Sequence, residues 1–450
     1  MKKIILYFLF LTSARFSLAQ EYLPDWNSLD ARPIPEWFTK AKFGIFIHWG
    51  LYSVPSWATN SYADGFGSNY AEWYWQRLNA TNLKIHKEFV EFHERVYGKN
   101  FKYPDFAPLF KCELFDPRQW ADIFKNAGAR YVVLTSKHHD GFTLWPSAES
   151  WNWNSMDIGP HRDLAGELSA AVKDAGLHMG FYYSLYEWYN PIYKTDVNKY
   201  VNNRMLPQLK DLVTRYNPEV IWSDGDWDHS DTVWKSKEFL TWLYNKSAVK
   251  NTVVVNDRWG AGKHGGFNST EYGKGNSSLQ RPWEETRGIG ESFGYNRNES
   301  LTQYMSSEKL VHMLIEIVAK GGNLLLNIGP AADGSIPVIM QQRLKDIGDW
   351  LKVNGEAIYE TTAWKEAPEK NQDNIFFTRK GNDLYVIVTK WKDEIEIKNI
   401  GKVQDVSMPG YNDKIKFRAR GNKVVITAPL LNPGNMPCQF AWVYKLKEAF

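Results

Sequence analysis

The run RYVVLTSKHHDG, residues 130–141, begins as an apolar, β-branched stretch and ends in two histidines and an aspartate. The same plan, an apolar run that stops abruptly at polar or aromatic residues, recurs in KFGIFIHWG (42–50), HMGFYYSLYEW (178–188), EVIWSDGDW (219–227), TVVVNDRWG (252–260) and GNLLLNIGP (322–330). Near-continuous apolar runs are typical of strands buried on both faces, as in a parallel sheet covered by helices.

Helical patterns separate these runs. In FDPRQWADIFKNAGA (115–129), Asp116 is expected to cap a helix that begins at Pro117 and ends before Gly128. RDLAGELSAAVKDAGLH (162–178) has the same form and ends at Gly176. Repeated helix–strand units predict a (β/α)8-type, TIM-like barrel over residues 20–362, a fold that carries catalytic residues at the carboxyl ends of its strands.

The pattern changes after the helix expected over residues 337–359. NIFFTRKGNDLYVIVTKW, EIEIKN, KIKFRARGNKVVITAP and CQFAWVYKLK alternate apolar and polar residues with a period of two, and Gly/Asn turns join them. This alternation predicts a C-terminal antiparallel β-sandwich over residues 363–450. The segment shows no chemical motif of its own.

Residues 1–19 have the pattern of a secretory signal peptide, with Lys2 and Lys3 at the start, an apolar middle and a small-residue end before Gln20. The apolar run is too short to span a bilayer comfortably, and no later segment supplies about 20 apolar residues. We therefore expect an exported protein without membrane insertion, periplasmic or secreted, or lysosomal in a eukaryote.

Charge and composition exclude several partners. Lys2, Lys3 and Arg15 are removed with the signal, which contains no acid, so the net charge falls from +3 to zero. A neutral chain without a basic tract gives no electrostatic reason to expect nucleic acid. The two cysteines, Cys112 and Cys438, are far apart and predict neither a disulfide framework nor a thiolate metal cluster. The 21 Trp, 24 Tyr and 24 Phe suit flat sugar faces as well as a core.

Three carboxylates in two regions are candidates for acid–base chemistry. Asp224 ends the run EVIWSDGDW, where a buried carboxylate must either act or be paired, while Asp226 and Asp228 are better explained as loop charges. Glu271 and Glu284 follow in a long loop rich in Gly, Ser and Asn, and loops of that length are usually functional. Two carboxyl groups about 5 Å apart across a pocket support retaining glycoside hydrolysis.

The histidines allow a metal site or a sugar site. Adjacent strand residues point to opposite faces, which makes joint metal ligation by His138 and His139 awkward, and no HExxH or His/Cys cluster accompanies them. No metal and no cofactor is therefore expected. A sugar site needs polar groups around a ring together with aromatic walls, and both are supplied by His48, Glu72, Trp73, His138, His139, Trp222 and Arg258.

The motifs together resemble the α-L-fucosidases of glycoside hydrolase family 29. The matching segments lie between residue 37 and about residue 337 and include KFGIFIHWG, AEWYW, KHHDGFTLWPS, IWSDGDW, VVVNDRWG, STEY and WEETRGIGESFGYNRNE. The combination of FIHWG, KHHDGF and NDRWG is highly specific. The resemblance implies a retaining exo-hydrolase that releases terminal α-L-fucose from a fucosylated oligosaccharide or glycoconjugate.

The resemblance also implies roles for individual residues. Asp224 of WSDG matches the nucleophile and Glu271 of STEY the acid/base of bacterial relatives, with Glu284 of RPWEE as the alternative acid/base. Fucose hydroxyls are expected on His48, Glu72, Trp73, His138, His139 and Arg258, and the 6-methyl group on Phe46, Tyr182, Trp222 and Phe293. For both His138 and His139 to face the pocket, the strand must end or bulge between them.

Two other functions stay open at this stage. A related barrel glycosidase could prefer another hexose, and a catalytically silent protein could bind sugar on the same scaffold. The fucosyl linkage and a homo-oligomeric state are not determined by the sequence.

Overall fold

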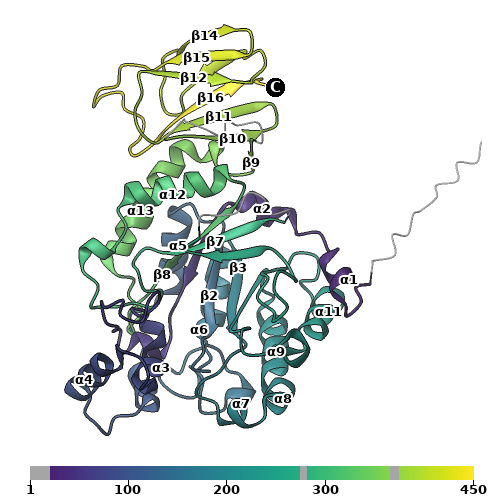
Figure 1. Cartoon of the computed structure of the whole chain (residues 1–450), viewed down its shortest axis with the longest axis vertical. Coiled ribbons are helices and arrows are strands. Elements are labelled where there is room, and N and C mark those ends of the chain that lie inside the picture. Colours follow the sequence, from purple (N-terminus) through teal and green to yellow (C-terminus); the bar gives the residue numbers. More distant parts are fainter. Residues whose placement is uncertain (1–20, 274–280, 365–373) are drawn as a thin grey trace, which may run out of the picture.

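The computed structural model describes residues 21–273, 281–364 and 374–450 (Figure 1). The predicted signal peptide, residues 1–19, lies outside the described residues. Over the described part, a large helix-covered sheet occupies most of the chain, and a smaller all-β region follows it at the C-terminal end.

Eight parallel strands form the large sheet: β1 (Phe43–Ile47), β2 (Tyr131–Lys137), β3 (His178–Ser184), β4 (Val220–Asp224), β5 (Val254–Val255), β6 (Asn268–Glu271), β7 (Trp283–Gly288) and β8 (Asn323–Ile328). Their spatial order is β5-β4-β3-β2-β1-β8-β7-β6. Strands β1, β2, β4 and β8 are buried along their whole length, because both faces are covered. The predicted parallel sheet is confirmed, but the long loop expected around Glu271 and Glu284 is wrong. These residues lie in β6 and β7, which lack the apolar runs of the other strands and are defined by their pairing with each other and with β8.

The curled sheet departs from a fully closed barrel at one seam. No strand pairing joins β5 to β6 in the described residues, although the Phe267 N–H donates to the Val255 carbonyl at 3.0 Å. A Cβ atom at Gly266 would lie 1.7 Å from that carbonyl oxygen. Glycine thus lets the two backbones meet at one point, where the two-residue β5 is too short to form a ladder.

Helices alternate with the strands and cover the outside of the sheet (Figure 1). They are α1 (Trp26–Asp30), α2 (Glu36–Ala41), α3 (Tyr74–Asn79), α4 (His86–Val96), α5 (Pro117–Asn126), α6 (Leu164–Asp174), α7 (Pro191–Thr195), α8 (Val197–Tyr200), α9 (Leu206–Tyr216), α10 (Asp231–Trp234), α11 (Ser236–Lys246), α12 (Ser307–Ala319) and α13 (Val338–Asn354). The predicted cap of α5 is confirmed, since the Asp116 carboxylate accepts from the N–H groups of Arg118 and Gln119.

The C-terminal region consists of two antiparallel sheets, as expected for a β-sandwich. One has the order β13-β16-β11-β10-β9 and the other β12-β15-β14. Their strands are β9 (Thr362–Ala363), β10 (Ile375–Lys380), β11 (Asp383–Val388), β12 (Glu394–Lys398), β13 (Asp405–Ser407), β14 (Lys416–Arg420), β15 (Lys423–Thr427) and β16 (Trp442–Lys447).

Strand β11 shows how the two regions pack. Leu384 and Val386 belong to the core between the two antiparallel sheets, whereas Tyr385 and Ile387 pack into the core of the larger region, where β10 contacts α12. Successive side chains of β11 therefore point into different cores, because side chains alternate between the two faces of a strand. No helix in the described part of the chain is both long and apolar enough to cross a membrane.

Candidate active site

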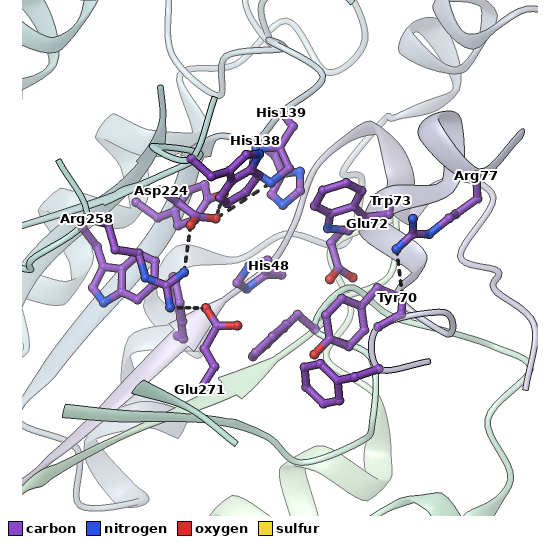
Figure 2. A pocket seen from close by; sticks show the side chains of 17 residues that line it. His48, Tyr70, Glu72, Trp73, Arg77, His138, His139, Asp224, Arg258 and Glu271 are labelled. Atoms are coloured by element: carbon purple, nitrogen blue, oxygen red, sulfur yellow. Dashed lines mark hydrogen bonds and ion pairs between the residues drawn. The ribbon is translucent and has the colours of Figure 1, made fainter. Parts of the chain in front are cut away.

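A pocket opens at the carboxyl ends of the parallel strands (Figure 2). Ten of the residues predicted for the site line it together with both catalytic candidates: Phe46, His48, Glu72, Trp73, His138, His139, Tyr182, Trp222, Asp224, Arg258, Glu271 and Phe293. Carboxyl ends of parallel strands meet at one edge of a sheet, which is why residues more than 200 positions apart converge here.

Asp224 and Glu271 are held by the same arginine. Arg258 places Nη1 2.8 Å from Oδ1 of Asp224 and Nη2 2.6 Å from Oε1 of Glu271. Tyr182 donates its hydroxyl to the other oxygen of Asp224 at 2.8 Å. Asp224 ends β4 and Glu271 ends β6, and the Arg258 guanidinium lies between their two carboxylates (Figure 2).

Burial and charge act on Glu271 in opposite directions. Burial raises its pKa, the positive charge of Arg258 lowers it, and the negative charge of Asp224 raises it again, with a net rise. The second carboxylate oxygen of Glu271 has no hydrogen-bond partner within the described ranges. Glu271 thus combines an elevated pKa with one oxygen free to carry a proton towards the pocket.

His138 and His139 both line the pocket, and strand β2 ends at Lys137, immediately before them. The pairing of β2 with β3 shifts register between Thr135 and Lys137. The strand therefore ends ahead of both histidines and not between them, and the turn that follows lets both rings face the same side.

The three histidines of the pocket are neutral at ordinary pH. Burial lowers the pKa of His48 to about 4 and those of His138 and His139 well below their usual value. Asn327 Oδ1 lies 2.7 Å from His48 Nδ1, and Ser184 Oγ lies 2.6 Å from His139 Nδ1. The free nitrogens of neutral imidazoles can donate to or accept from hydroxyl groups.

Glu72 lies in a short 3-10 turn, η2 (Ala71–Trp73), and is buried. Its Oε2 accepts from the N–H of Gly294 at 2.8 Å and from the hydroxyl of Ser292 at 3.3 Å. Burial is the largest influence and raises its pKa to about 7. Trp73 follows directly and packs edge-on against His139, with ring centroids 5.1 Å apart.

One corner of the pocket is apolar. Phe46 contacts Trp222 with centroids 5.2 Å apart, and Phe293 stacks on His48 at 5.0 Å. Tyr182 stacks on Trp222 at 5.7 Å and an interplanar angle of 19°. A pocket with many polar groups and one aromatic corner fits a small ring that carries hydroxyls and a methyl group.

Glu284 does not line the pocket. It is fully buried in β7, where it accepts from the Tyr131 hydroxyl at 2.6 Å and from the Trp222 indole at 2.9 Å. Burial raises its pKa to about 7. Both of its oxygens are already bonded, which points to support of the Trp222 ring.

Asp226 and Asp228 also lie outside the pocket lining. Asp226 accepts from the Gly260 N–H at 2.8 Å, and Asp228 accepts from the Tyr193 hydroxyl at 2.8 Å. The first hydrogen bond joins two loops and the second joins a loop to α7, so both carboxylates lie on a loop, as expected. Within the described ranges, no group of three or more His, Cys, Asp or Glu is placed to hold a metal ion.

Five residues of the lining were not predicted from the sequence: Phe66, Gly67, Tyr70, Arg77 and Trp227. Trp227 follows Asp224 by three positions within the quoted run 219–227, so its position next to a strand end was an available signal. Phe66, Gly67 and Tyr70 belong to the segment between β1 and α3, Arg77 lies in α3, and none of them carries a comparable signal.

Comparison with known proteins gives a consistent result over the whole chain. A family described as Alpha-L-fucosidase matches residues 9–356, and one described as Alpha-L-fucosidase C-terminal domain matches residues 368–447. The chain is 44% identical to plasma alpha-L-fucosidase of Homo sapiens and 42% identical to tissue alpha-L-fucosidase of Rattus norvegicus, in each case over 95% of this chain and 93% of the relative.

Comparison with solved structures gives the same family. A Thermotoga maritima alpha-fucosidase in complex with fucose superimposes with a TM-score of 0.79 at 38% identity, over 94% of this chain and 100% of the other. The same enzyme has been solved in complex with a mechanism-based inhibitor, with a TM-score of 0.80 over 95% of this chain.

Proposed function

This chain belongs to the α-L-fucosidase family, and from that membership we propose that it hydrolyses terminal α-L-fucose by double displacement, with Asp224 as nucleophile and Glu271 as acid/base. One observation carries the proposal: Arg258 contacts both carboxylates, at 2.8 Å and 2.6 Å, inside a pocket lined by sugar-binding groups. Paired carboxyl groups of this kind are the equipment of retaining glycosidases.

In the first step, an Asp224 oxygen attacks C1 of the fucose while Glu271 gives its proton to the glycosidic oxygen. The bond from C1 to that oxygen breaks, and the aglycone leaves as an alcohol. In the second step, Glu271 takes a proton from water, the water oxygen attacks C1, and the Asp224 carboxylate is released. Two displacements at C1 return the original α configuration.

The pairing with Arg258 suits Asp224 as nucleophile. The guanidinium holds one oxygen of the Asp224 carboxylate in place and puts a positive charge beside it, so the side chain is oriented for attack on C1. Tyr182 also donates to Asp224 at 2.8 Å and can strengthen that bond when the carboxylate is the leaving group. Glu271, whose pKa is raised by burial, fits the acid role.

Fucose recognition is assigned to the rest of the lining. The neutral imidazoles of His48, His138 and His139 supply donors and acceptors to ring hydroxyls. Glu72, with a pKa raised to about 7, and the Trp73 indole add further polar contacts. The 6-methyl group is assigned to the apolar corner of Phe46, Tyr182, Trp222 and Phe293.

Glu271 is favoured over Glu284 as the acid/base. Glu284 has both oxygens bonded, to Tyr131 and Trp222, and lies outside the pocket lining. In Glu271→Ala, we expect hydrolysis of 4-nitrophenyl α-L-fucoside to fall by about 10²- to 10⁴-fold, the usual contribution of a general acid–base group. Added azide should restore turnover by attacking the fucosyl-enzyme without base assistance.

The variant Glu284→Gln is compared with Glu271→Ala. It keeps the size of the side chain and one acceptor, so we expect a far smaller loss and no response to azide. If instead azide restores Glu284→Gln and leaves Glu271→Ala fully active without it, the acid/base is Glu284. If the folded wild type hydrolyses aryl galactosides faster than aryl fucosides, the hexose preference is wrong, and if it hydrolyses neither, it is a silent sugar-binding protein.

The cellular location of the protein and the boundaries of its two regions are part of the same proposal. Relatives carry the names tissue and plasma α-L-fucosidase. With the signal pattern of residues 1–19, this supports export to the periplasm or the medium, or to lysosomes in a eukaryote. We place the catalytic region at residues 20–362 and the sandwich at 363–450, and the retention time in gel filtration would show whether the chain forms a homo-oligomer.

A further inference from the structure

The pocket becomes more exposed from the nucleophile outward. The Asp224 side chain is 12% exposed and that of Glu271 is 27% exposed, whereas Phe66 at the pocket rim is 65% exposed. In a retaining reaction, the leaving oxygen lies beside the acid, on the side of C1 away from the nucleophile. The ring attached to that oxygen must therefore extend past Glu271 towards the rim.

Aromatic rings form a continuous wall along that path. Phe293, deep in the pocket, lies 5.7 Å from Tyr272 and 5.4 Å from Tyr70 between ring centroids. Phe66 in turn lies 5.1 Å from Tyr272 and 5.6 Å from Tyr70. Tyr272 is the residue directly after Glu271, so the middle of this wall adjoins the proposed acid in the chain, and Phe66 continues the wall outward.

We propose that Phe66 is a specificity-determining residue that stacks on the sugar ring next to fucose, the ring that leaves with the glycosidic oxygen. The inference rests on the proposed function and adds the substrate class: a glycan whose second residue is a pyranose with an apolar face. Aromatic side chains suit such faces, because the C–H groups of the ring are apolar while its hydroxyls stay in water.

Trp227 is the other exposed aromatic residue of the lining, at 53% exposure, but it belongs to the opposite side. Its ring stacks on Trp73 at 6.3 Å and lies 5.5 Å from His139, two groups assigned to fucose itself. It also follows the nucleophile by three residues. The leaving ring lies on the acid's side, which leaves Phe66 for that contact.

The test compares two fucosyl donors that differ only in the leaving group. One is α-L-fucosyl fluoride, which has no second ring, and the other is a fucosyl-galactose disaccharide. For Phe66→Ala we expect kcat/KM on the disaccharide to fall about tenfold, as for the loss of one aromatic contact, and to change less than about twofold on the fluoride. Phe66→Tyr keeps the ring and should stay near the wild type on both.

Trp151→Ala is the matched control, because Trp151 is 78% exposed and does not line the pocket. It should leave both rates unchanged. Equal losses in Phe66→Ala on both donors would overturn the inference and assign Phe66 to the fucose pocket, and no loss on either would also overturn it. A folded wild type that releases no fluoride at all overturns the proposed function as well, which separates the two failures.

Discussion

Two clusters of basic side chains and carboxylates adjoin the residues His138 and His139. The pocket cluster comprises Asp224, Arg258 and Glu271, and His139 Nε2 lies 3.8 Å from Asp224. The sealed cluster comprises Glu187, Arg204 and Lys137, the residue directly before His138. The side chains of Lys137 and Glu187 are both 0% exposed.

In the sealed cluster, both oxygens of the Glu187 carboxylate accept hydrogen bonds. Glu187 Oε1 accepts from Lys137 at 2.7 Å and from Arg204 at 3.2 Å, and Oε2 accepts from Asn190 at 3.0 Å. Burial raises the pKa of Glu187, but the charges of Lys137 and Arg204 outweigh it and bring the pKa down to about 2. Such a carboxylate stays ionised, and neither of its oxygens is left without a hydrogen bond.

In the pocket cluster, part of the hydrogen-bonding capacity of the carboxylates is unused. Glu271 shares one guanidinium with Asp224 and has one oxygen without a hydrogen bond within the described ranges, and its pKa is raised where that of Glu187 is lowered. The same residue types thus serve structure when every oxygen is paired and serve chemistry when one is left open to the pocket. Substitutions in the two clusters should separate activity from stability.

The largest effect is expected for Asp224→Asn. The amide cannot attack C1, so kcat for 4-nitrophenyl α-L-fucoside should fall by about 10⁴-fold or more, as for loss of a catalytic nucleophile. The melting temperature should stay close to that of the wild type, because the side chain keeps its size and a hydrogen-bond acceptor. A marked loss of stability with substantial residual activity would place Asp224 with the sealed cluster instead.

Glu187→Gln should show the opposite behaviour. Breaking a buried ion pair by removing one partner leaves an uncompensated charge, which typically destabilises a protein by about 3–5 kcal/mol. Urea unfolding measures this change, and kcat of the folded fraction should stay within about tenfold of the wild type because Glu187 does not line the pocket. Normal stability with lost activity would contradict a structural role for the sealed cluster.

Arg258→Ala should have a smaller effect on rate and a distinct effect on pH dependence. Loss of the charged contact to the nucleophile should lower kcat/KM by about 10²-fold. Arg258 lowers the pKa of Glu271, so its removal raises that pKa further and keeps the acid protonated to higher pH. The alkaline limb of the kcat/KM profile should therefore move to higher pH, and Arg258→Lys should move it back towards the wild type. A shift to lower pH would contradict the assignment of that limb to Glu271.

Asp228→Asn should have the smallest effect. Asp228 is exposed, lies four residues after the nucleophile and accepts one hydrogen bond from Tyr193 at 2.8 Å. We expect kcat/KM within about twofold of the wild type, the range for a surface substitution away from special features. A tenfold loss would mean that the loop after β4 contributes to the site beyond Trp227.

The sequence predicted six of the eight parallel strands and the residues at their ends, because these depend on local patterns, but it placed Glu271 and Glu284 of β6 and β7 in a long loop. An apolar run followed by polar residues, as in 219–227, is readable without the fold, and Asp224, Trp222 and Trp227 all belong to it. The alternation in β11 was readable in the same way. The seam between β5 and β6 was not, since it depends on Gly266 meeting a carbonyl of another strand.

Contacts between distant loops were also beyond the sequence. Glu72 depends on the N–H of Gly294, 222 residues away, and Phe66 packs on Tyr272, which comes from a distant part of the chain. Lys137 and Glu187 were both visible in the quoted runs, yet their pairing requires the fold. Such pairs are fixed by how loops cross at the strand ends, which no periodicity encodes.

The stereochemistry of azide capture tests the central claim most directly. In Asp224→Ala, azide should enter the vacated nucleophile position and give β-L-fucosyl azide from an α-fucoside. In Glu271→Ala, azide should attack the fucosyl-enzyme from the opposite face and give α-L-fucosyl azide. NMR of the two products distinguishes the anomers. This pair of products would confirm Asp224 as nucleophile and Glu271 as acid/base, and the same anomer from both variants, or the reverse assignment, would contradict it.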